Sequence, residues 1–391
     1  MTAGPPPHPT IKVLHIASGD LWAGAEVQLY TLAKALKKRP DTEVAVILLN
    51  HGTLAERLTA CGIETRIIDE TRYNGIQILR RLIRLLRDLG PDVVHTHRIK
   101  ENILGSLAAA IAGIPSLRTV HGAPEHPPSW WRLDKSALYW MDILCGRLLQ
   151  RRIVAVSAPL AAALSPPYPA TAISTIENGL DLEEVSKALP VGTSQSPDPG
   201  AKTKVGLVGR LVPVKRVDLF LHTARQIKSA HPELDISFHV YGDGPLRAAL
   251  EALSRELELT DSVRFEGHCE AIHSKIAELD ILMMTSDHEG LPMTLLEAMA
   301  LRTLVVAHAV GGIPALLDQG RCGVLVTEHS AEGYTKALGR VLQSAGPRHA
   351  LATRARARVA RLYSAAGNAQ AYAEVYASLT DTTGLERAPL R

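Results

Sequence analysis

The segment IKVLHIASGDLWAGAEVQLYTLAKALKKRPDTEVAVILLN (residues 11–50) decides the fold class. It passes from a short apolar stretch (11–17) through a longer stretch with helical periodicity (25–38) to a second apolar stretch (43–50). This alternation is typical of parallel strands joined by crossover helices. It continues to about residue 178 and predicts a doubly wound, Rossmann-like α/β unit.

A second unit of the same kind follows a connecting segment. Residues 190–202, PVGTSQSPDPGAK, are rich in Pro, Gly, Ser and Asp and lack hydrophobic periodicity, which is typical of an exposed connection. The strand–helix alternation then restarts. We therefore predict a loose tail (1–10), an N-terminal acceptor-side domain (11–188), a linker (189–204), a C-terminal domain (205–364) and a helical segment (365–391) that could pack back on the N-terminal domain.

Composition narrows the class of protein. The 391 residues include 43 Lys plus Arg against 40 Asp plus Glu, a surplus too small to indicate a nucleic-acid partner. The four cysteines form no Cys-x-x-Cys pair, which favours a reducing compartment over a disulfide framework or a cysteine zinc site. The most apolar stretch (103–117) is shorter than the roughly 20 residues that a membrane-spanning helix needs. We expect a cytoplasmic protein without a transmembrane segment.

The segment DHEGLPMTLLEAMA (287–300) combines two glutamates with a helix start. Pro292 suits the first helical turn because its missing N–H would have no partner there. We therefore predict a helix from Pro292 through Ala300, with Glu289 in the loop before it and Glu297 on the helix, about a turn and a half further along.

The start of this helix is a candidate anion site. The backbone N–H groups of Met293 and Thr294 point outward there, at the positive end of the helix dipole. Two acids beside such a site suit a ligand with hydroxyls on both sides of a phosphate, as in a nucleotide sugar. Taken alone, two glutamates with this spacing more often have no binding role: one is stabilised by the helix dipole, and the other is simply exposed to solvent.

Two further loops follow strands of the second unit. VGRLVPVKRVD (208–218) offers Arg210 and Lys215, which could donate charge-assisted hydrogen bonds to a diphosphate, although surface cations are usually just solvated. VYGDGPLRAAL (240–250) contains a turn at Gly242 that could contact a ligand at a strand's carboxyl end or be purely structural.

Taken in chain order, these motifs resemble a known family. The series GR…K, YGDGPL, FEG, EGLP, EAMA and VGGIP resembles the nucleotide-sugar domain of glycosyltransferase family 4, whose members are retaining enzymes of the GT-B fold. In the first half, LWAGAEVQLYTLAKAL, VVHTH, TVHG and IENGLD are similar to that family's glycine loop, cleft-facing strand ends and pre-linker segment. The resemblance covers about residues 11–380 and implies two Rossmann-like domains facing across a cleft.

The resemblance also implies roles for residues on the donor side. Arg210 and Lys215 would hold the diphosphate with help from the backbone N–H groups of Met293 and Thr294. Glu289 would bind hydroxyls of the donor sugar.

Four more residues complete the candidate site. Glu297 would bind the ribose hydroxyls, and Gly242 lies in the donor-side glycine turn. His121 would lie near the sugar and its developing positive charge, and Gly24 would let the backbone approach the phosphates and the acceptor closely. Without the family, His121 reads as an ordinary loop histidine with its hydrogen bonds satisfied.

Three positions depart from the family pattern. Ala23 replaces the first of two adjacent glycines, Arg216 stands where glycine often follows the phosphate lysine, and Ala315 replaces a glutamate after the GGIP loop. None of these changes removes a side chain expected to grip the donor.

No metal or separate cofactor is expected. His95 and His97 are a pair of imidazoles without a third ligand in the sequence pattern, which favours packing at a strand end. The partners implied are a nucleotide-sugar donor and a glycan or lipid-linked acceptor, in bacterial cell-surface polysaccharide synthesis. A nucleotide-sugar epimerase of the same fold and a non-catalytic nucleotide-sugar-binding subunit remain alternatives.

Two segments are compatible with peripheral membrane contact. The helix predicted over 76–90 places Arg80, Arg84 and Arg87 on one face, a pattern that suits anionic lipid but is also that of a solvated outer helix. WWRLDKSALYW (130–140) gathers three of the four tryptophans, which could stack on sugars, enter a membrane interface or pack beneath the cleft.

Overall fold

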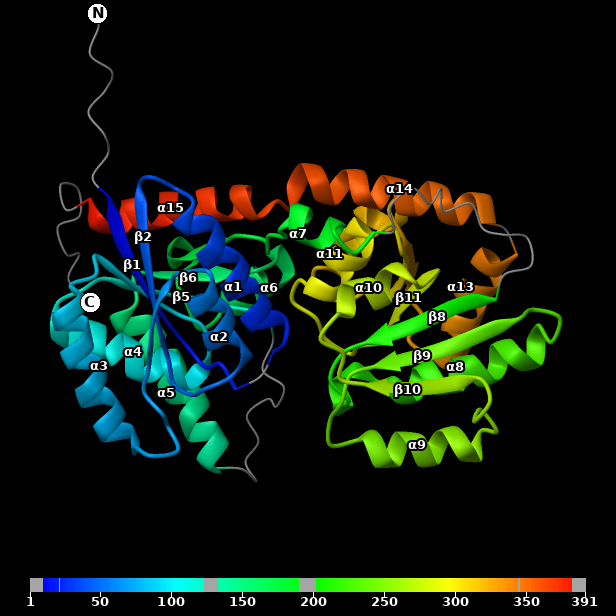
Figure 1. Ribbon diagram of the computed structural model, residues 1–391. Coiled ribbons are helices and arrows are strands. Elements are labelled where there is room, and N and C mark those ends of the chain that lie inside the picture. The colour runs from blue at the N-terminus through cyan, green and yellow to red at the C-terminus, as the bar shows by residue number, and fades with distance from the viewer. Residues whose placement is uncertain (1–9, 21, 123–132, 190–201, 344, 382–391) are drawn as a thin grey trace, which may run out of the picture. The chain divides into compact units, whose positions relative to one another are not determined.

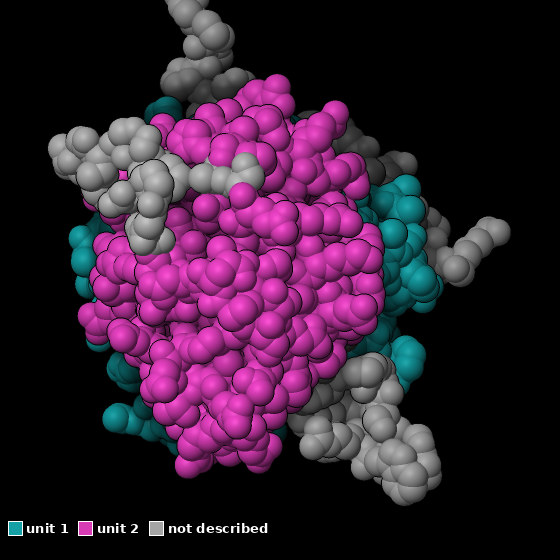
Figure 2. Space-filling view, turned by 90° about the vertical axis from the view of Figure 1, so that its right-hand side faces the viewer, with its two compact units in different colours: residues 1–179, 365–391 teal, residues 180–364 magenta. Residues whose placement is uncertain are grey.

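The structure is a computed structural model that describes residues 10–20, 22–122, 133–189, 202–343 and 345–381. The chain forms two compact units, distinguished by colour in Figure 2. Unit 1 comprises residues 1–179 and 365–391, and unit 2 comprises residues 180–364.

Unit 1 is built on one parallel seven-stranded sheet with the order β3-β2-β1-β4-β5-β6-β7. The order reverses between β1 and β4, as expected for a doubly wound sheet. Its central strands are buried on both faces because helices cover both. The strands are β1 (Ile11–Ala17), β2 (Thr42–Leu48), β3 (Glu64–Ile67), β4 (Val93–Thr96), β5 (Ser116–Val120), β6 (Arg152–Ala155) and β7 (Ile173–Thr175).

Two groups of helices sandwich this sheet (Figure 1). One face packs on α1, α2 and the C-terminal helix α15, and the other on α3 and α4, with α5 beside α4. The helices are α1 (Gly24–Lys37), α2 (Thr53–Ala60), α3 (Gly75–Leu89), α4 (Ile99–Ala112), α5 (Leu133–Leu149), α6 (Ala158–Leu164), the 3₁₀ turn η1 (Ala170–Ala172) and α15 (Ala365–Thr380).

Helix α15 returns to unit 1 after the chain has passed through unit 2. Tyr372 and Tyr376 lie one helical turn apart and are fully buried against the sheet. Asn368 anchors the start of the helix, since its side chain donates to the carbonyl of Glu177 (2.6 Å) and accepts from Gln28 (3.0 Å). The C-terminal helical segment thus completes the core of unit 1.

Unit 2 repeats the design with a parallel six-stranded sheet in the order β10-β9-β8-β11-β12-β13. The order reverses between β8 and β11. The strands are β8 (Thr203–Val208), β9 (Ile236–Tyr241), β10 (Val263–Gly267), β11 (Ile281–Met284), β12 (Leu304–His308) and β13 (Val324–Val326).

The helices of unit 2 likewise cover both faces of its sheet. A core of aliphatic residues with Phe220, Phe238 and Tyr334 fills the space beneath α8 and α13. The helices and 3₁₀ turns are α7 (Leu182–Ser186), η2 (Pro213–Lys215), α8 (Val217–Ala230), α9 (Arg247–Glu256), α10 (Ile272–Ala277), α11 (Met293–Ala300), α12 (Ile313–Leu316), η3 (Asp318–Gly320), α13 (Ala331–Leu342) and α14 (Ala345–Leu362).

The segment 180–188 groups with unit 2, although the sequence analysis assigned it to the N-terminal domain. The backbone N–H of Leu180 donates to the carbonyl of Tyr363 (2.8 Å), and Arg356 donates to the Ser186 hydroxyl (3.2 Å). These long-range contacts, which leave no trace in local periodicity, tie α7 to α14. Residues 1–9 of the predicted tail and residues 190–201 of the predicted linker lie outside the described residues.

The sequence also predicted that the chain has no membrane-spanning segment. In the part of the chain that the structure describes, no helix is both long enough and apolar enough to cross a bilayer.

Candidate functional site

The candidate site of unit 2 lies where its strand order reverses. The loops that leave β8 and β11 begin on either side of this switch point, which is where ligands bind in open α/β sheets. The loop after β8 carries Arg210 and Lys215, and the loop after β11 carries Glu289. Sheet topology therefore places the predicted cations and the first predicted acid at one edge.

Lys215 and Glu289 form a direct ion pair. Lys215 Nζ lies 2.6 Å from Glu289 Oε1, and the side chains are 25% and 11% exposed. Two hydrogen bonds to backbone carbonyls fix the loops relative to each other: the Thr285 hydroxyl donates to the carbonyl of Lys215 (2.8 Å), and the Asp287 N–H donates to the carbonyl of Val214 (2.8 Å). The pair is thus held by the backbone as well as by charge.

The loop carrying Glu289 is braced from the opposite side by the VGGIP segment. The N–H of Gly312 donates to the carbonyl of Gly290 (2.9 Å). Gly311 has a φ of 56°, and a Cβ at this position would collide with the carbonyl oxygen of Glu289. Only glycine fits this left-handed, close approach, so Gly311 positions the Glu289 backbone.

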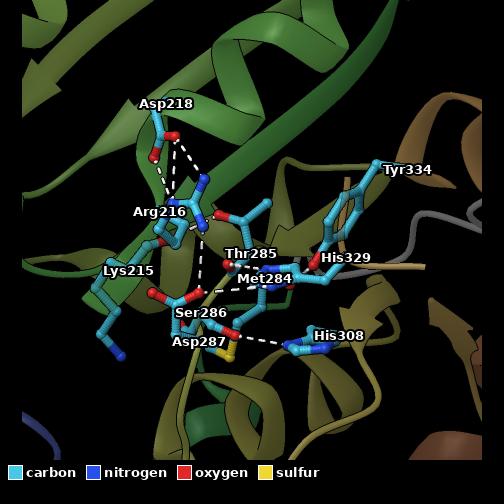
Figure 3. A network of polar contacts seen from close by, with 10 residues as sticks. All are labelled: Lys215, Arg216, Asp218, Met284, Thr285, Ser286, Asp287, His308, His329 and Tyr334. Carbon is cyan, nitrogen blue, oxygen red and sulfur yellow. Dashed lines mark hydrogen bonds and ion pairs between the residues drawn. The ribbon is translucent and has the colours of Figure 1, made fainter. Parts of the chain in front are cut away.

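Arg216, one of the departures from the family pattern, occupies a left-handed backbone position with a φ of 46°. Glycine adopts this conformation readily, which explains why the family often has glycine there. In this chain the Arg216 guanidinium binds Asp218 (2.9 Å) and Asp287 (3.3 Å), as Figure 3 shows. The hydrogen bonds to Asp218 raise the pKa of Arg216 above its ordinary value.

Two histidines that the sequence analysis missed extend this network (Figure 3). The rings of His308 and His329 stack with centroids 3.7 Å apart. His308 Nδ1 lies 2.9 Å from the carbonyl oxygen of Ser286, and His329 Nδ1 lies 3.5 Å from an Asp287 oxygen. Burial lowers the pKa of His308. They lie at the end of β12 and just after β13, and only their position at strand ends could have signalled them.

Helix α11 (Met293–Ala300) follows Pro292, which confirms the predicted helix. Glu297 lies on it with 7% of its side chain exposed, and its Oε1 is 3.3 Å from His273 Nε2. Because the first N–H groups of a helix have no intrahelical acceptor, those of Met293 and Thr294 can bind an anion.

The remaining donor-side candidates lie in the loops after β8 and β9. Arg210 is exposed between β8 and η2. The N–H of Leu211 donates to the carbonyl of Asp243 (2.9 Å), which joins the two loops. Gly242 has a φ of 131°, and a Cβ there would collide with the carbonyl oxygen of Gly209. Close backbone packing therefore accounts for this glycine.

Gly24 and His121 belong to unit 1. Gly24 opens α1, where an added Cβ would lie within 4 Å of no described atom. His121 directly follows β5, and its Nε2 lies 3.2 Å from His97 Nδ1. The two candidates therefore do not belong to the same unit as the Lys215–Glu289 pair.

A third histidine joins the His95 and His97 pair that the sequence singled out. His15, His95 and His97 each offer a nitrogen within 4.8 Å of the others, a spacing that could accommodate a metal ion. However, His95 Nδ1 is 2.8 Å from the Tyr376 hydroxyl and His95 Nε2 is 2.8 Å from Thr119 Oγ1. Both nitrogens of His95 are thus occupied by hydrogen bonds, which does not suit a three-histidine metal centre.

Models of known protein families match a segment in each half of the chain. Residues 22–184 match the model of Glycosyltransferase Family 4, and residues 202–344 match that of Glycosyl transferases group 1. The chain belongs to glycosyltransferase family 4. The fold and family implied by the sequence motifs are therefore confirmed, and the protein is a glycosyltransferase.

Curated relatives of this glycosyltransferase cover most of the chain at moderate identity. It is 27% identical over 346 residues to the UDP-Gal:alpha-D-GlcNAc-diphosphoundecaprenol alpha-1,3-galactosyltransferase of Escherichia coli, covering 85% of this chain and 88% of the relative. It is 28% identical over 304 residues to the D-inositol 3-phosphate glycosyltransferase of Salinispora tropica, covering 70% and 61%.

Solved structures share the fold of this glycosyltransferase at low sequence identity. The crystal structure of Anabaena Alr3699/HepE in complex with UDP-glucose has a TM-score of 0.79 and 20% identity, and covers 94% of this chain and 100% of that one. The structural neighbours are GT-B glycosyltransferases, so the chain has the GT-B fold.

Proposed function

We propose that this glycosyltransferase moves a sugar from a nucleoside-diphosphate sugar to a hydroxyl group of a glycan or lipid-linked acceptor, with retention of anomeric configuration. The observation that carries the proposal is the Lys215–Glu289 pair, which lies at the switch point of unit 2 just before the N-terminus of α11. A cation, free helix N–H groups and a carboxylate next to one another suit a diphosphate flanked by polyols.

In this proposal the diphosphate is bound by Arg210, Lys215 and the N–H groups of Met293 and Thr294. These groups stabilise the negative charge that develops on the leaving nucleoside diphosphate. The bond between the anomeric carbon and the phosphate oxygen breaks, the acceptor oxygen bonds to the anomeric carbon on the same face, and the acceptor proton passes to the departing phosphate. The two glutamates bind hydroxyls: Glu289 those of the sugar and Glu297 those of the ribose.

The relatives support a uridine nucleotide as the donor. The E. coli relative is named for UDP-Gal, and HepE was solved with UDP-glucose. The relatives' names point to different acceptors. The name of the E. coli relative gives a diphosphoundecaprenol-linked sugar, and that of the Salinispora tropica relative gives an inositol phosphate. We favour the lipid-linked class of acceptor because unit 1 exposes apolar side chains that suit a membrane surface.

Unit 1 exposes an apolar stripe on α5 that suits a membrane surface. Five large apolar side chains of α5 are between 42% and 61% exposed, an unusual density for one surface helix. In the same layer of helices, α3 contributes exposed arginines, which suit anionic headgroups. Trp130 and Trp131 lie outside the described residues. The exposed α5 residues are Leu138, Trp140, Met141, Leu144 and Leu148.

We therefore propose a cytoplasmic enzyme that contacts the inner face of the membrane. Co-sedimentation with phosphatidylglycerol vesicles should exceed that with phosphatidylcholine vesicles. Leu144→Glu should reduce it, since a charge in the apolar stripe opposes insertion. Ile111→Glu changes an exposed apolar residue of α4 outside the stripe and serves as the matched control. Equal binding of the wild type and Leu144→Glu would remove the α5 stripe from the proposal.

An activity assay tests the catalytic proposal directly. The protein is incubated with UDP-glucose, UDP-galactose or UDP-N-acetylglucosamine, with and without a short-chain polyprenyl-diphosphate sugar. We expect acceptor-dependent release of UDP and a product whose anomeric coupling constant in proton NMR shows retention. Epimerised donor in the absence of acceptor would instead support an epimerase. Donor binding without turnover on any acceptor would support a non-catalytic subunit.

A further inference from the structure

Three histidines of unit 1 form a hydrogen-bonded row. His15 Nδ1 lies 3.0 Å from His97 Nε2, and His97 Nδ1 lies 3.2 Å from His121 Nε2. The rings are nearly parallel, with interplanar angles of 20° and 23°. We call His15, His97 and His121 the histidine row.

Strand geometry explains why these three rings meet. His15 lies on β1 and is paired in register with His95 on the neighbouring strand β4. Side chains two residues apart on a strand point to the same face, so His97 follows His95 on the face that carries His15. His121 lies two residues beyond Thr119 of β5 and reaches the same face. The row therefore runs across the carboxyl ends of three adjacent parallel strands.

The chemistry of imidazole limits where the protons of the row can be. Burial lowers the pKa of His15 to about 3 and that of His121 to about 4, and it lowers the pKa of His97 well below its ordinary value. All three are therefore neutral at pH 7, and a neutral imidazole has one N–H and one acceptor nitrogen. Each of the two hydrogen bonds needs one proton, so only two arrangements exist. Either all three rings carry the proton on Nδ1, or all three carry it on Nε2.

The two ends of the row are buried and have no partner among the described residues. These ends are His15 Nε2 and His121 Nδ1. With all protons on Nε2, the buried N–H without an acceptor is that of His15. With all protons on Nδ1, the N–H at the free end is that of His121, and an oxygen of a bound ligand can accept its hydrogen bond. Buried donors without acceptors are rare and costly, so such a ligand stabilises the Nδ1–H arrangement of the whole row.

We propose that His15 and His97 are positioning residues that set which nitrogen of His121 carries its proton, so that His121 Nδ1–H donates to an oxygen of the bound sugar donor. The row itself follows from unit 1 alone, whereas the donor as its ligand rests on the proposed function. His95 lies beside the row but takes no part in it, because its nitrogens bind Tyr376 and Thr119.

Long-range ¹H–¹⁵N correlation NMR of protein labelled with ¹⁵N-histidine tests the row without any turnover. The tautomers of the three rings are read at pH 7, with and without saturating UDP-glucose. Assignment uses one substitution at each position: His15→Gln, His97→Gln and His121→Gln. We expect His15, His97 and His121 to share one tautomer. UDP-glucose should increase the fraction of molecules in which all three rings carry the proton on Nδ1. Different tautomers within the row, or a charged His121, would overturn the proposal.

His97→Leu breaks the row at its centre and should uncouple the tautomer of His121 from that of His15. In the transfer assay we expect kcat to fall by about 10- to 100-fold, by analogy with the loss seen when the hydrogen-bond partner of a metal-ligating histidine is removed. The donor KM should change less than kcat. Should His97→Leu fail to fold, His97→Gln is the second variant, since an amide fills the site but cannot exchange tautomers.

Tyr376→Phe is the matched control, because it removes a buried hydrogen bond to His95 and leaves the histidine row intact. It should lower stability but change neither the tautomers of the row nor kcat. If His97→Leu and Tyr376→Phe affect kcat equally, the row has only a structural role. If no transfer is found with any acceptor, the proposed function fails, while the tautomer measurement still decides whether the row is coupled.

Discussion

Lys215 and Glu289 lie in different loops, 74 residues apart in the chain, yet their charged atoms are 2.6 Å apart. The ammonium group of Lys215 neutralises Glu289 while no diphosphate is present. In the proposed function, a bound diphosphate is a second anion for Lys215, and the remaining lone pairs of Glu289 bind sugar hydroxyls. The ion pair thus links the two loops, and under the proposed function it also prepares the donor site.

Lys215→Ala should reduce kcat/KM for transfer by about 10²- to 10³-fold, because a charged donor to the leaving group is lost. Initial rates of UDP release measure the effect, and circular dichroism checks that the fold is kept. Lys275→Ala, which removes a surface lysine paired with Glu278 at 3.0 Å, is the control and should leave kcat/KM unchanged. Unaltered turnover in Lys215→Ala would remove this lysine from the mechanism.

Glu297→Ala should weaken UDP binding by about tenfold or more, since hydrogen bonds to a charged group contribute about 1.5–3 kcal/mol each. Isothermal titration calorimetry with UDP measures the change. Because Glu297 also contacts His273, His273→Ala is measured in parallel to separate the loss of that contact from the loss of the ribose contact. Equal UDP affinity in the wild type and Glu297→Ala would contradict the ribose assignment.

Gly311→Ala should destabilise unit 2 by about 2 kcal/mol or more. A Cβ costs about 1–2 kcal/mol in left-handed backbone, and here it would also collide with the carbonyl oxygen of Glu289. Urea unfolding followed by circular dichroism measures the free energy. Gly346→Ala places a Cβ in open space near the start of α14 and should not destabilise the protein. Similar unfolding free energies for the two variants would show that the loop relaxes around the added methyl group.

Tyr376→Phe should lower the free energy of unfolding by about 1–3 kcal/mol, because His95 Nδ1 is left without its buried partner. Thermal and urea unfolding both report this loss. Tyr73→Phe, at a partly exposed tyrosine, removes the same hydroxyl and should change stability by less than about 0.5 kcal/mol. A negligible effect of Tyr376→Phe would mean that water replaces the tyrosine hydroxyl.

The histidine row also predicts how stability depends on pH. The native pKa of His15 is about 3 and the ordinary pKa of histidine is 6.5, so below pH 6.5 the unfolded chain binds a proton that the native protein does not. The stability from His15 is therefore complete above pH 6.5 and is lost as pH falls towards 3, at about 1.4 kcal/mol per pH unit.

His15→Gln removes this titrating group and isolates its contribution from that of the carboxylates. The difference in unfolding free energy between wild type and His15→Gln should be constant above pH 7 and should shift in favour of the variant as pH falls from 6.5 to 4. Urea unfolding at half-unit pH steps measures this difference. A difference that does not change with pH would mean that His15 titrates normally in the native protein.

Several features could be predicted because they depend on local pattern. The alternation that begins at residues 11–50 predicted two sheets of parallel strands, and Pro292 predicted the start of α11. Motif order singled out Lys215 and Glu289, and the parallel topology then brought them to one edge. The departure at Arg216 was visible in the motif, but its left-handed backbone and its partner Asp287, 71 positions away, were seen only in the structure.

By itself the sequence determined which segments are strands and helices, and which polar residues end the strands, because side-chain periodicity and backbone preference act within a few residues. The tertiary structure decided that α15 returns to unit 1, and that His15, His97 and His121 become neighbours. Such contacts depend on strand order and register, which are set by packing the whole core. Nothing in the sequence around His15 in β1 indicates that it hydrogen-bonds to His97, 82 positions later.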